Sequence, residues 1–198
     1  MEALVRRIVN RMSYLELINE QEKEYCQYFL ELTLEKIFAL GMIFIMAFCM
    51  NRVLEMLLFF VTFSSIRKYA GGYHCRTFYG CFLLSVGVCF VCAGPLSDGM
   101  RTSPQLVQIL VTLICVGVIL VLGAINHPDM SWDAGELRRA KNTARSMAVV
   151  LGGAVVSFHC LGIVPQYAFY MAEGIWVSAF SMLVAKLLGQ EVACSPAE

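Results

Sequence analysis

Residues 104–125 read PQLVQILVTLICVGVILVLGAI, and they contain no Asp, Glu, Lys or Arg. An α-helix needs about 20 apolar residues, at ~1.5 Å each, to cross the roughly 30 Å hydrocarbon core of a bilayer. This stretch is long enough, and the uncharged run around it extends over residues 102–128. The sequence therefore predicts a membrane-spanning helix here.

The composition of the whole chain supports the same class of protein. Of its 198 residues, 59% are hydrophobic and only 15% are charged, whereas soluble domains carry roughly 25% charged residues. The net charge is zero, and no basic stripe with interleaved aromatic residues is present, so nucleic acid is not expected as a partner. We expect an all-α integral membrane helical bundle in the lipid bilayer, with residues 1–198 forming a single membrane domain.

Three other parts of the chain also predict spans. Residues 77–97 and residues 146–172 lack charged side chains entirely. Residues 166–185 contain only one charge, Glu173, and Pro165 separates them from the preceding span. A proline at this place is typical of a turn between two helices.

Residues 37–66 are ambiguous because Asn51, Arg52 and Glu55 lie in their middle. A single helix would place these charges at the bilayer centre, at a cost of roughly 2.5–3.5 kcal/mol each. A hairpin that turns at Asn51–Arg52 avoids this cost and gives two short spans. The sequence thus predicts six transmembrane helices, at about residues 33–50, 53–66, 78–96, 104–125, 146–164 and 166–186.

The distribution of positive charge predicts the orientation. Lys and Arg concentrate in cytoplasmic segments. With six spans and a cytoplasmic N-terminus, all of the 15 Lys and Arg residues except Arg52 and Arg101 fall on the cytoplasmic side. A single crossing by residues 37–66 would destroy this asymmetry. We therefore expect both termini to be cytoplasmic.

Residues 1–30 are too polar to span a membrane, but they are amphipathic. Hydrophobic residues recur at helical spacing and arginines lie opposite them, as in an interfacial helix. The alternative is a solvated helix or one packed on a partner. The hydrophobic positions are Leu4, Ile8, Met12 and Leu15, and the arginines are Arg6, Arg7 and Arg11.

Residues 67–81, RKYAGGYHCRTFYGC, combine glycines, basic residues, a histidine and two cysteines between apolar runs. A catalytic cysteine acts as a thiolate, which a nearby imidazole and positive charge favour. His74 supplies the imidazole, and Cys75 and Cys81 compete for the role of nucleophile. Adjacency to His74 is no advantage for Cys75, because neighbouring side chains in regular structure diverge.

The seven-residue interval between His74 and Cys81 restricts the backbone. On a continuous helix the two residues would lie about 10.5 Å apart along the axis, too far for a hydrogen bond. A joint role therefore requires a bend between them, and Gly71–Gly72 and Gly80 permit one. We expect a re-entrant loop here, since irregular backbone at membrane depth must be buried in protein or line a wet cavity.

One other interpretation of this segment remains open from the residues alone. His74 would be an interfacial histidine, Cys81 a small packing residue, and the arginines anchors at the membrane boundary. A structural zinc site is not expected, because no pair of CxxC motifs lies outside the spans. No metal and no cofactor are predicted.

The pattern R-x3-GG-x-H-x6-C, formed by Arg67, Gly71–Gly72, His74 and Cys81 after two short spans, resembles the accessory gene regulator B (AgrB) family. These are bacterial integral-membrane cysteine endopeptidases that mature quorum-sensing peptides. The resemblance implies that His74 and Cys81 are catalytic, and that the protein is a multi-pass protein of the bacterial cell membrane with its active site at the cytoplasmic face. It also implies a homodimer.

The substrate implied by the resemblance is an AgrD-like propeptide with an amphipathic leader, a core containing Cys or Ser, and an acidic C-terminal tail. Cys81 would cleave off the tail through an acyl thioester, and the core would then cyclise to a thiolactone or lactone. The expected substrate-binding residues are Arg67, Lys68, Gly71, Gly72, Arg76, Arg138, Arg139 and Lys141.

One family feature is matched only loosely. A proline-containing basic segment after the fourth span corresponds to residues 126–145, NHPDMSWDAGELRRAKNTAR. His127–Pro128 lies in the corresponding place, but the basic residues follow later, from Arg138 onward. This departure leaves the substrate-binding role of the segment open.

Two functions of other classes remain as alternatives. A small transporter would use Glu173 and His74 as a relay, although the chain lacks two halves with corresponding broken spans. A non-enzymatic membrane scaffold would need neither. Glu173 is expected either to snorkel or to line a path. Arg52 and Glu55, three residues apart, are expected to be able to pair near the outer face.

Overall fold

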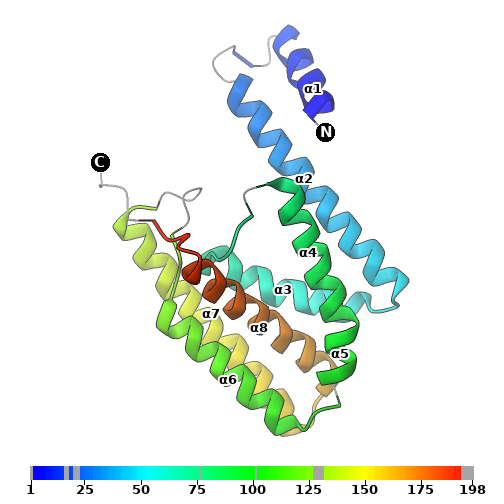
Figure 1. The fold of residues 1–198 in the computed structure, drawn as a ribbon, viewed down its shortest axis with the longest axis vertical. Coiled ribbons are helices and arrows are strands. Elements are labelled where there is room, and N and C mark those ends of the chain that lie inside the picture. Colours follow the sequence, from blue (N-terminus) through cyan, green and yellow to red (C-terminus); the bar gives the residue numbers. More distant parts are fainter. Residues whose placement is uncertain are drawn as a thin grey trace.

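The computed structural model describes residues 2–15, 18–19, 23–75, 77–100, 102–126 and 132–192. These residues form helices and no strand, which confirms the all-α prediction (Figure 1). The helices are α1 (Glu2–Tyr14), α2 (Lys23–Cys49), α3 (Val53–Ala70), α4 (Phe78–Ala93), α5 (Pro95–Met100), α6 (Gln105–Leu122), α7 (Ala134–Leu161) and α8 (Pro165–Leu187).

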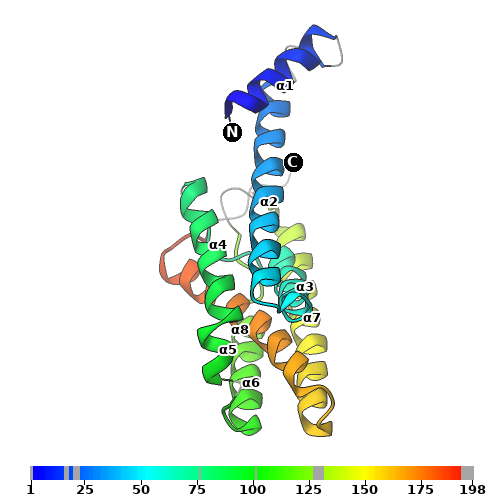
Figure 2. The same ribbon diagram turned by 90° about the vertical axis from the view of Figure 1, so that its right-hand side faces the viewer.

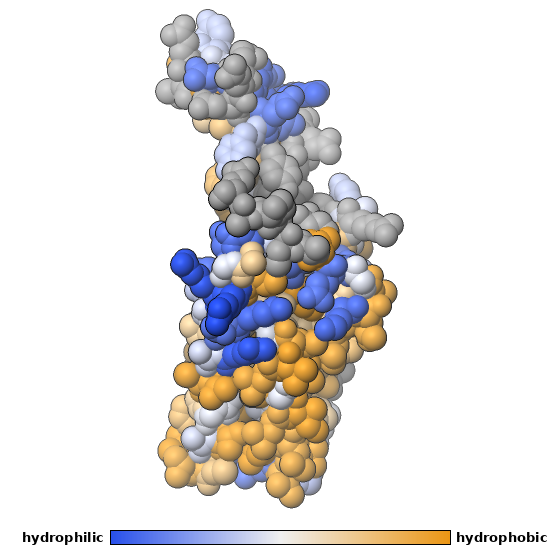
Figure 3. Space-filling view, turned by 90° about the vertical axis from the view of Figure 1, so that its left-hand side faces the viewer, coloured by the Kyte–Doolittle hydropathy of each residue, from blue (hydrophilic) through white to orange (hydrophobic). Residues whose placement is uncertain are grey.

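Within the described residues, four helical stretches are long and apolar enough to cross a membrane: Tyr79–Met100, which comprises most of α4 and all of α5, and helices α6, α7 and α8. The apolar part of α2, Ile37–Cys49, is shorter. In Figures 1 and 2, α3 is strongly inclined to α2 and α4. Figure 3 shows a hydrophobic lower body beneath a band of hydrophilic residues. The protein is thus a membrane protein, and the count of six spans stays a prediction.

The predicted turn at Asn51–Arg52 is present. Helix α2 ends at Cys49 and α3 begins at Val53, and Asn51 has a φ of +54°. Asparagine adopts this left-handed conformation more readily than most residues. The chain therefore reverses here rather than forming one long helix over residues 37–66.

Some helix boundaries differ from those predicted. Residues 1–30 do not form one helix, because α1 ends at Tyr14 and α2 already begins at Lys23. Helix α1 lies across the far end of α2, away from the bundle (Figure 2). The polar start of α2 continues into its apolar part because backbone hydrogen bonds propagate a helix irrespective of side-chain polarity. Polarity therefore marks the membrane boundary and not the start of the helix.

Helix α7 also begins earlier than the predicted span of residues 146–164. A capping box starts it at Asp133: the Glu136 N–H donates to Asp133 Oδ1 at 2.6 Å, and the Asp133 N–H donates to Glu136 Oε2 at 3.2 Å. Such reciprocal bonds satisfy two N–H groups that would otherwise lack partners. The first three turns of α7 therefore extend beyond its apolar part and carry basic residues.

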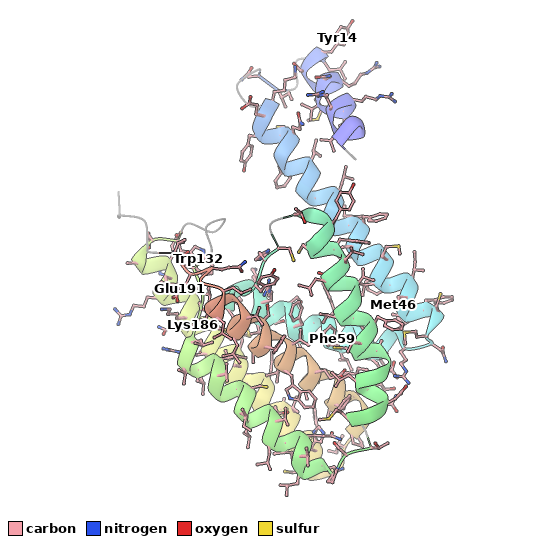
Figure 4. The ribbon with its side chains drawn as sticks, in the orientation of Figure 1. Tyr14, Met46, Phe59, Trp132, Lys186 and Glu191 are labelled. Carbon is pink, nitrogen blue, oxygen red and sulfur yellow. The ribbon has the colours of Figure 1, made fainter. Side chains whose placement is uncertain are left out.

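Helix α8 is the central helix of the bundle, with most of its residues buried. Gly174 allows close contact with α3, since a Cβ at this position would lie 2.8 Å from the Phe59 carbonyl oxygen. Small residues bring membrane helices together in this way. Phe59 itself is buried beneath α4 and α8 (Figure 4). Helix α8 thus provides a rigid frame for the segments that contact it.

Hydrogen bonds join several connections at one end of the bundle, which we call the site end. The Ile125 N–H donates to the Ala70 carbonyl at 2.9 Å, and the Val192 N–H donates to the Asn126 carbonyl at 2.9 Å. The main-chain N–H of Trp132 donates to Asn126 Oδ1. Trp132 and Glu191 both lie in this region (Figure 4). The connections after α3, α6 and α8 therefore meet at the site end.

The predicted pairing of Arg52 with Glu55 is wrong. Arg52 donates to Asp98 at 2.8 Å, to the Tyr170 hydroxyl at 3.0 Å and to the Ala93 carbonyl. The hydrogen bond that Arg52 donates to Asp98 raises the pKa of Arg52 above its ordinary value. Glu55 instead accepts a hydrogen bond from Gln166 at 2.7 Å. The turn between α2 and α3 places Arg52 on the side facing α4, and both residues therefore find partners on other helices.

Glu173 lies inside the bundle. Its side chain is fully buried, and neither carboxylate oxygen has a hydrogen-bond partner among the described residues. Snorkelling is therefore excluded, since a snorkelling carboxylate would reach the aqueous boundary. Other buried polar groups at the far end of α6 and α7 are paired: His159 Nε2 lies 2.8 Å from Gln108 Oε1, and Trp176 donates to Thr112 at 3.0 Å.

Candidate functional site

The helix is interrupted between His74 and Cys81, as the sequence predicted. Helix α3 ends at Ala70, residues 71–75 are not helical, and α4 starts at Phe78. Thr77 caps α4: its side chain accepts from the Gly80 N–H at 3.3 Å, and its carbonyl accepts from the Cys81 N–H at 3.1 Å. Cys81 is therefore fixed in the first turn of α4, where the helix dipole favours negative charge.

The glycine segment (residues 71–75) requires its two glycines. Gly71 and Gly72 have φ values of +69° and +131°, a region that other residues rarely adopt. A Cβ on Gly71 would lie 2.6 Å from the Ile125 carbonyl oxygen. A Cβ on Gly72 would overlap the Arg67 guanidinium and lie 2.8 Å from Ser181 Oγ. Gly71 and Gly72 are buried against protein and residues 73–75 are half-buried, and the re-entrant position of the segment in the membrane stays a prediction.

Arg67 and Ser181 hold the middle of the glycine segment. Arg67 donates to the Tyr73 carbonyl and to Ser181 Oγ. The Tyr73 N–H in turn lies 3.1 Å from both the carbonyl oxygen and the hydroxyl of Ser181. Arg67 was predicted to bind substrate, and the structure shows that it first of all ties the glycine segment to α8.

Cys81 lines an apolar cavity of about 460 Å³ between α2, α3, α4 and α8. Arg67, Tyr73 and Ser181 line the same cavity, and Arg67 is the charged residue among its lining side chains. Arg67 is close enough to Cys81 to interact electrostatically with it. The size and apolar lining are typical of a ligand pocket with a few polar groups. The other lining residues are Ala39, Leu40, Ile43, Phe59, Phe60, Phe63, Leu84, Ser85, Val88, Cys89, Val177, Phe180 and Val184.

Cys75 does not line this cavity. Its side chain lies against α4, where a Cβ on Gly80 would be 3.2 Å from Cys75 Cβ and 3.6 Å from its Sγ. Of the two cysteines that compete for the role of nucleophile, Cys81 is therefore the one with access to a pocket.

His74 is half-buried and follows Tyr73, which lines the cavity. Its main chain is held from the end of α8: the His74 N–H donates to Gln190 Oε1 at 3.0 Å, and Gln190 Nε2 donates to the His74 carbonyl at 2.7 Å. The glycine segment thus carries His74 alongside α8, and α4 carries Cys81 on the other side of the bend.

The other predicted substrate-binding residues fall into separate groups. Lys68 is exposed at the end of α3, with its ammonium 5.4 Å from the centroid of the Tyr69 ring. Arg138 and Lys141 line a shallow depression of about 450 Å³ on α7 together with Arg145. Arg139 points about 100° away from Arg138 around the helix and does not line it. Arg76 and His127–Pro128 lie outside the described residues.

Ser181 and Gln190 were missed by the sequence interpretation. Ser181 is one of two serines in a mostly apolar span, and nothing in the sequence distinguishes it from Ser178. Gln190 comes directly after Gly189, a typical helix-end residue, which indicates a turn but not what the side chain contacts. Both contacts join residues more than 100 positions apart.

Gly72→Ala is expected to disturb this arrangement. The added methyl group would displace Arg67 and Ser181 and strain a backbone at positive φ, at a cost of about 1–3 kcal/mol. We expect a lower thermal unfolding midpoint in detergent and a loss of any activity that depends on the glycine segment. Gly153→Ala is the matched control, since a Cβ there has no neighbour within 4 Å. Equal effects of the two substitutions would contradict the proposed constraint.

The described structure is that of an all-helical membrane protein in which a thiol and a half-buried arginine line an apolar cavity at one end of the bundle. The family model for accessory gene regulator B matches residues 2–186, and the chain therefore belongs to the AgrB family. No curated protein and no solved structure gives a significant match. Membership is consistent with a role in processing quorum-sensing propeptides, and the homodimer expected from the family stays a prediction.

Proposed function

We propose that this protein is a membrane-embedded cysteine endopeptidase that removes the C-terminal tail of a quorum-sensing propeptide and promotes cyclisation of the core. The observation that carries the proposal is that Cys81 lines the apolar cavity together with Arg67 and Tyr73, and that His74 directly follows Tyr73. A nucleophile, an imidazole and a positive charge in one region are the components of thiol acyl transfer.

In the first step the His74 imidazole takes the proton of the Cys81 thiol. The thiolate attacks the carbonyl carbon between core and tail, and the C–N bond breaks. His74 passes the proton to the departing amine, so that the tail leaves with a neutral amino group and the core remains as an acyl thioester on Cys81. Arg67, which lines the same cavity, places a positive charge near the attacking sulfur.

In the second step the core's own Cys or Ser attacks the thioester carbonyl. Its proton passes through His74 to the departing Cys81 sulfur, and a thiolactone or lactone ring forms. Water would compete with this attack and give a linear peptide. The apolar walls of the cavity limit that competition by excluding water from the thioester.

The site end has an apolar cavity and a separate basic surface, and these would bind different parts of the propeptide. The cavity is lined almost entirely by apolar side chains, which suits the core residues that stay attached to Cys81. The acidic tail has a separate partner in the basic face of α7, formed by Arg138, Lys141 and Arg145. Helix α7 is linked through residues 123–125 to the end of α3, directly before the glycine segment, because Gly123 packs on Lys141 and the Ile125 N–H donates to the Ala70 carbonyl.

The tail contact leads to a charge-reversal prediction. Lys141→Glu is expected to raise the KM for a propeptide with an acidic tail about tenfold, because attraction at a partly exposed site becomes repulsion. A propeptide with a basic tail should be processed better by this variant than by the wild type. The measurement is tail release by the purified protein in liposomes, followed by mass spectrometry.

Lys186→Glu is the matched control for this test. Lys186 is an exposed lysine near the end of α8 and does not line the α7 depression (Figure 4). It receives the same change of charge, so its KM should stay within about twofold of the wild-type value. An equal rise in both variants would mean that only the overall charge of this surface matters.

A further inference from the structure

The side-chain amide of Gln190 forms hydrogen bonds with both main-chain groups of His74, its N–H and its carbonyl. Oε1 accepts from the His74 N–H at 3.0 Å, and Nε2 donates to the His74 carbonyl at 2.7 Å. A side-chain amide thus uses a donor and an acceptor in the way that a neighbouring strand would. The pairing leaves residue 74 little freedom to rotate or shift relative to α8.

Gln190 is itself firmly placed by the end of α8. The Gly189 N–H donates to the Lys186 carbonyl at 3.1 Å, and the Gln190 N–H donates to the Ala185 carbonyl at 3.0 Å. Together with the φ of +67° at Gly189, these bonds form a Schellman motif, which ends a helix in one defined direction. Two residues later, the Val192 N–H donates to the Asn126 carbonyl at 2.9 Å. The chain is therefore anchored on both sides of Gln190.

Helix α8 also holds the residue before His74 and one wall of the cavity. Ser181 binds the Tyr73 N–H, and Val177, Ser181 and Val184 line the cavity that contains Cys81. One helix therefore sets the positions of the glycine segment and of the pocket into which the thiol opens. Gln190, just beyond the end of α8, adds a contact between this helix end and His74.

We propose that Gln190 is a positioning residue: its amide fixes the main chain of His74 so that the imidazole meets the Cys81 thiol, which makes the C-terminal segment (residues 188–192) part of the active site. This inference rests on the proposed function. Gln190 carries no charge and does not line the cavity, and its side-chain amide is bonded to the main chain of His74, so we expect its effect to be exerted through His74. A misplacement of about 1 Å in a catalytic group lowers a rate by about 100-fold.

The test compares two substitutions of Gln190 with a matched control. Gln190→Met keeps the length of the side chain but removes both hydrogen bonds, and Gln190→Glu keeps the acceptor for the His74 N–H while losing the donor. Gln166→Met is the control, because Gln166 also belongs to the α8 region and donates one hydrogen bond, to Glu55, away from the site end. Tail cleavage is measured in liposomes as kcat and KM, at a temperature well below every unfolding midpoint.

We expect Gln190→Met to lower kcat by about 10–100-fold with KM within about twofold. Gln190→Glu should fall between Met and the wild type, and Gln166→Met should keep the wild-type kcat. A second measurement is the rate at which iodoacetamide alkylates Cys81 as a function of pH, with the modified residue identified by mass spectrometry. The pH profile of Gln190→Met should move away from that of the wild type and toward that of His74→Ala. A residue that only stabilises the fold would leave this pH dependence unchanged.

A wild-type kcat in Gln190→Met, or an unchanged alkylation profile, overturns the positioning role. The Cys81→Ala variant in the same assay tests the proposed function separately. If Cys81→Ala still releases the tail, the endopeptidase mechanism is wrong. If Cys81→Ala is inactive while Gln190→Met cleaves normally, only the role of Gln190 is rejected.

Discussion

Cys81→Ala is expected to abolish release of the propeptide tail, with a loss of at least about three orders of magnitude in kcat. No other described thiol lines the cavity at the site end, apart from Cys89 on the deeper part of α4. Without a sulfur at position 81 the acyl thioester cannot form. Because the Cys81 side chain is only partly buried, the variant should keep a thermal unfolding midpoint close to that of the wild type.

Cys75→Ala is the control for this result. Cys75 directly follows His74 and is the alternative candidate for the nucleophile, but it packs on Gly80 and does not line the cavity. It should cleave at close to the wild-type rate. Intact-protein mass spectrometry after rapid quenching should find the core peptide attached to Cys81 in the wild type. An adduct on Cys75, or normal cleavage by Cys81→Ala, would show that the nucleophile has been wrongly assigned.

His74→Ala should lower kcat by about 10²–10⁴-fold, the range typical of general acid–base groups. In the proposed mechanism the imidazole accepts the thiol proton and returns it to the leaving amine, so its loss would slow both proton transfers. If the proposed role of His74 is right, added imidazole should restore part of the rate in His74→Ala by taking over the proton transfer. The main-chain bonds to Gln190 do not involve the ring and should persist.

His159→Ala is a matched histidine control. Its ring is buried and lies 2.8 Å from Gln108 Oε1 and 2.9 Å from the Val155 carbonyl, within the helix bundle. The substitution leaves the Gln108 side chain without this partner, so stability should fall by about 1–3 kcal/mol. Imidazole should not restore activity there. A His74→Ala variant that is as active as the wild type would contradict the proposed role of His74.

The membrane-embedded, all-helical nature of the protein was predictable because it depends on local composition. A run such as residues 104–125 is apolar whatever surrounds it, and α6 occupies it almost completely. The turn at Asn51–Arg52 was predictable for the same reason, because charge in mid-membrane is costly for any fold. The early starts of α2 and α7 were not predicted, since polarity reports the membrane boundary while caps and backbone bonds determine where a helix begins.

The motif residues of the site were visible in the sequence, but their partners were not. The interval between His74 and Cys81 showed that a joint role of the two residues requires an interruption of the helix, and the helix is interrupted there. The sequence did not show that Arg67 donates a hydrogen bond to the Tyr73 carbonyl, or that Arg52 pairs with Asp98 and not with Glu55. Hydrogen bonds between residues far apart in the chain follow from how helices pack, and one sequence contains no direct record of that packing.

By itself the sequence determined that this is a helical membrane protein with its chemistry-bearing residues between two apolar runs, because hydrophobicity and backbone geometry act over a few turns of chain. Only the tertiary structure decided that Cys81, and not Cys75, lines the cavity. Likewise, only helix α8 brings Ser181 and Gln190 to the glycine segment. These choices depend on the direction in which each helix leaves its cap, and a small change of direction there moves a side chain from a pocket to a packed surface.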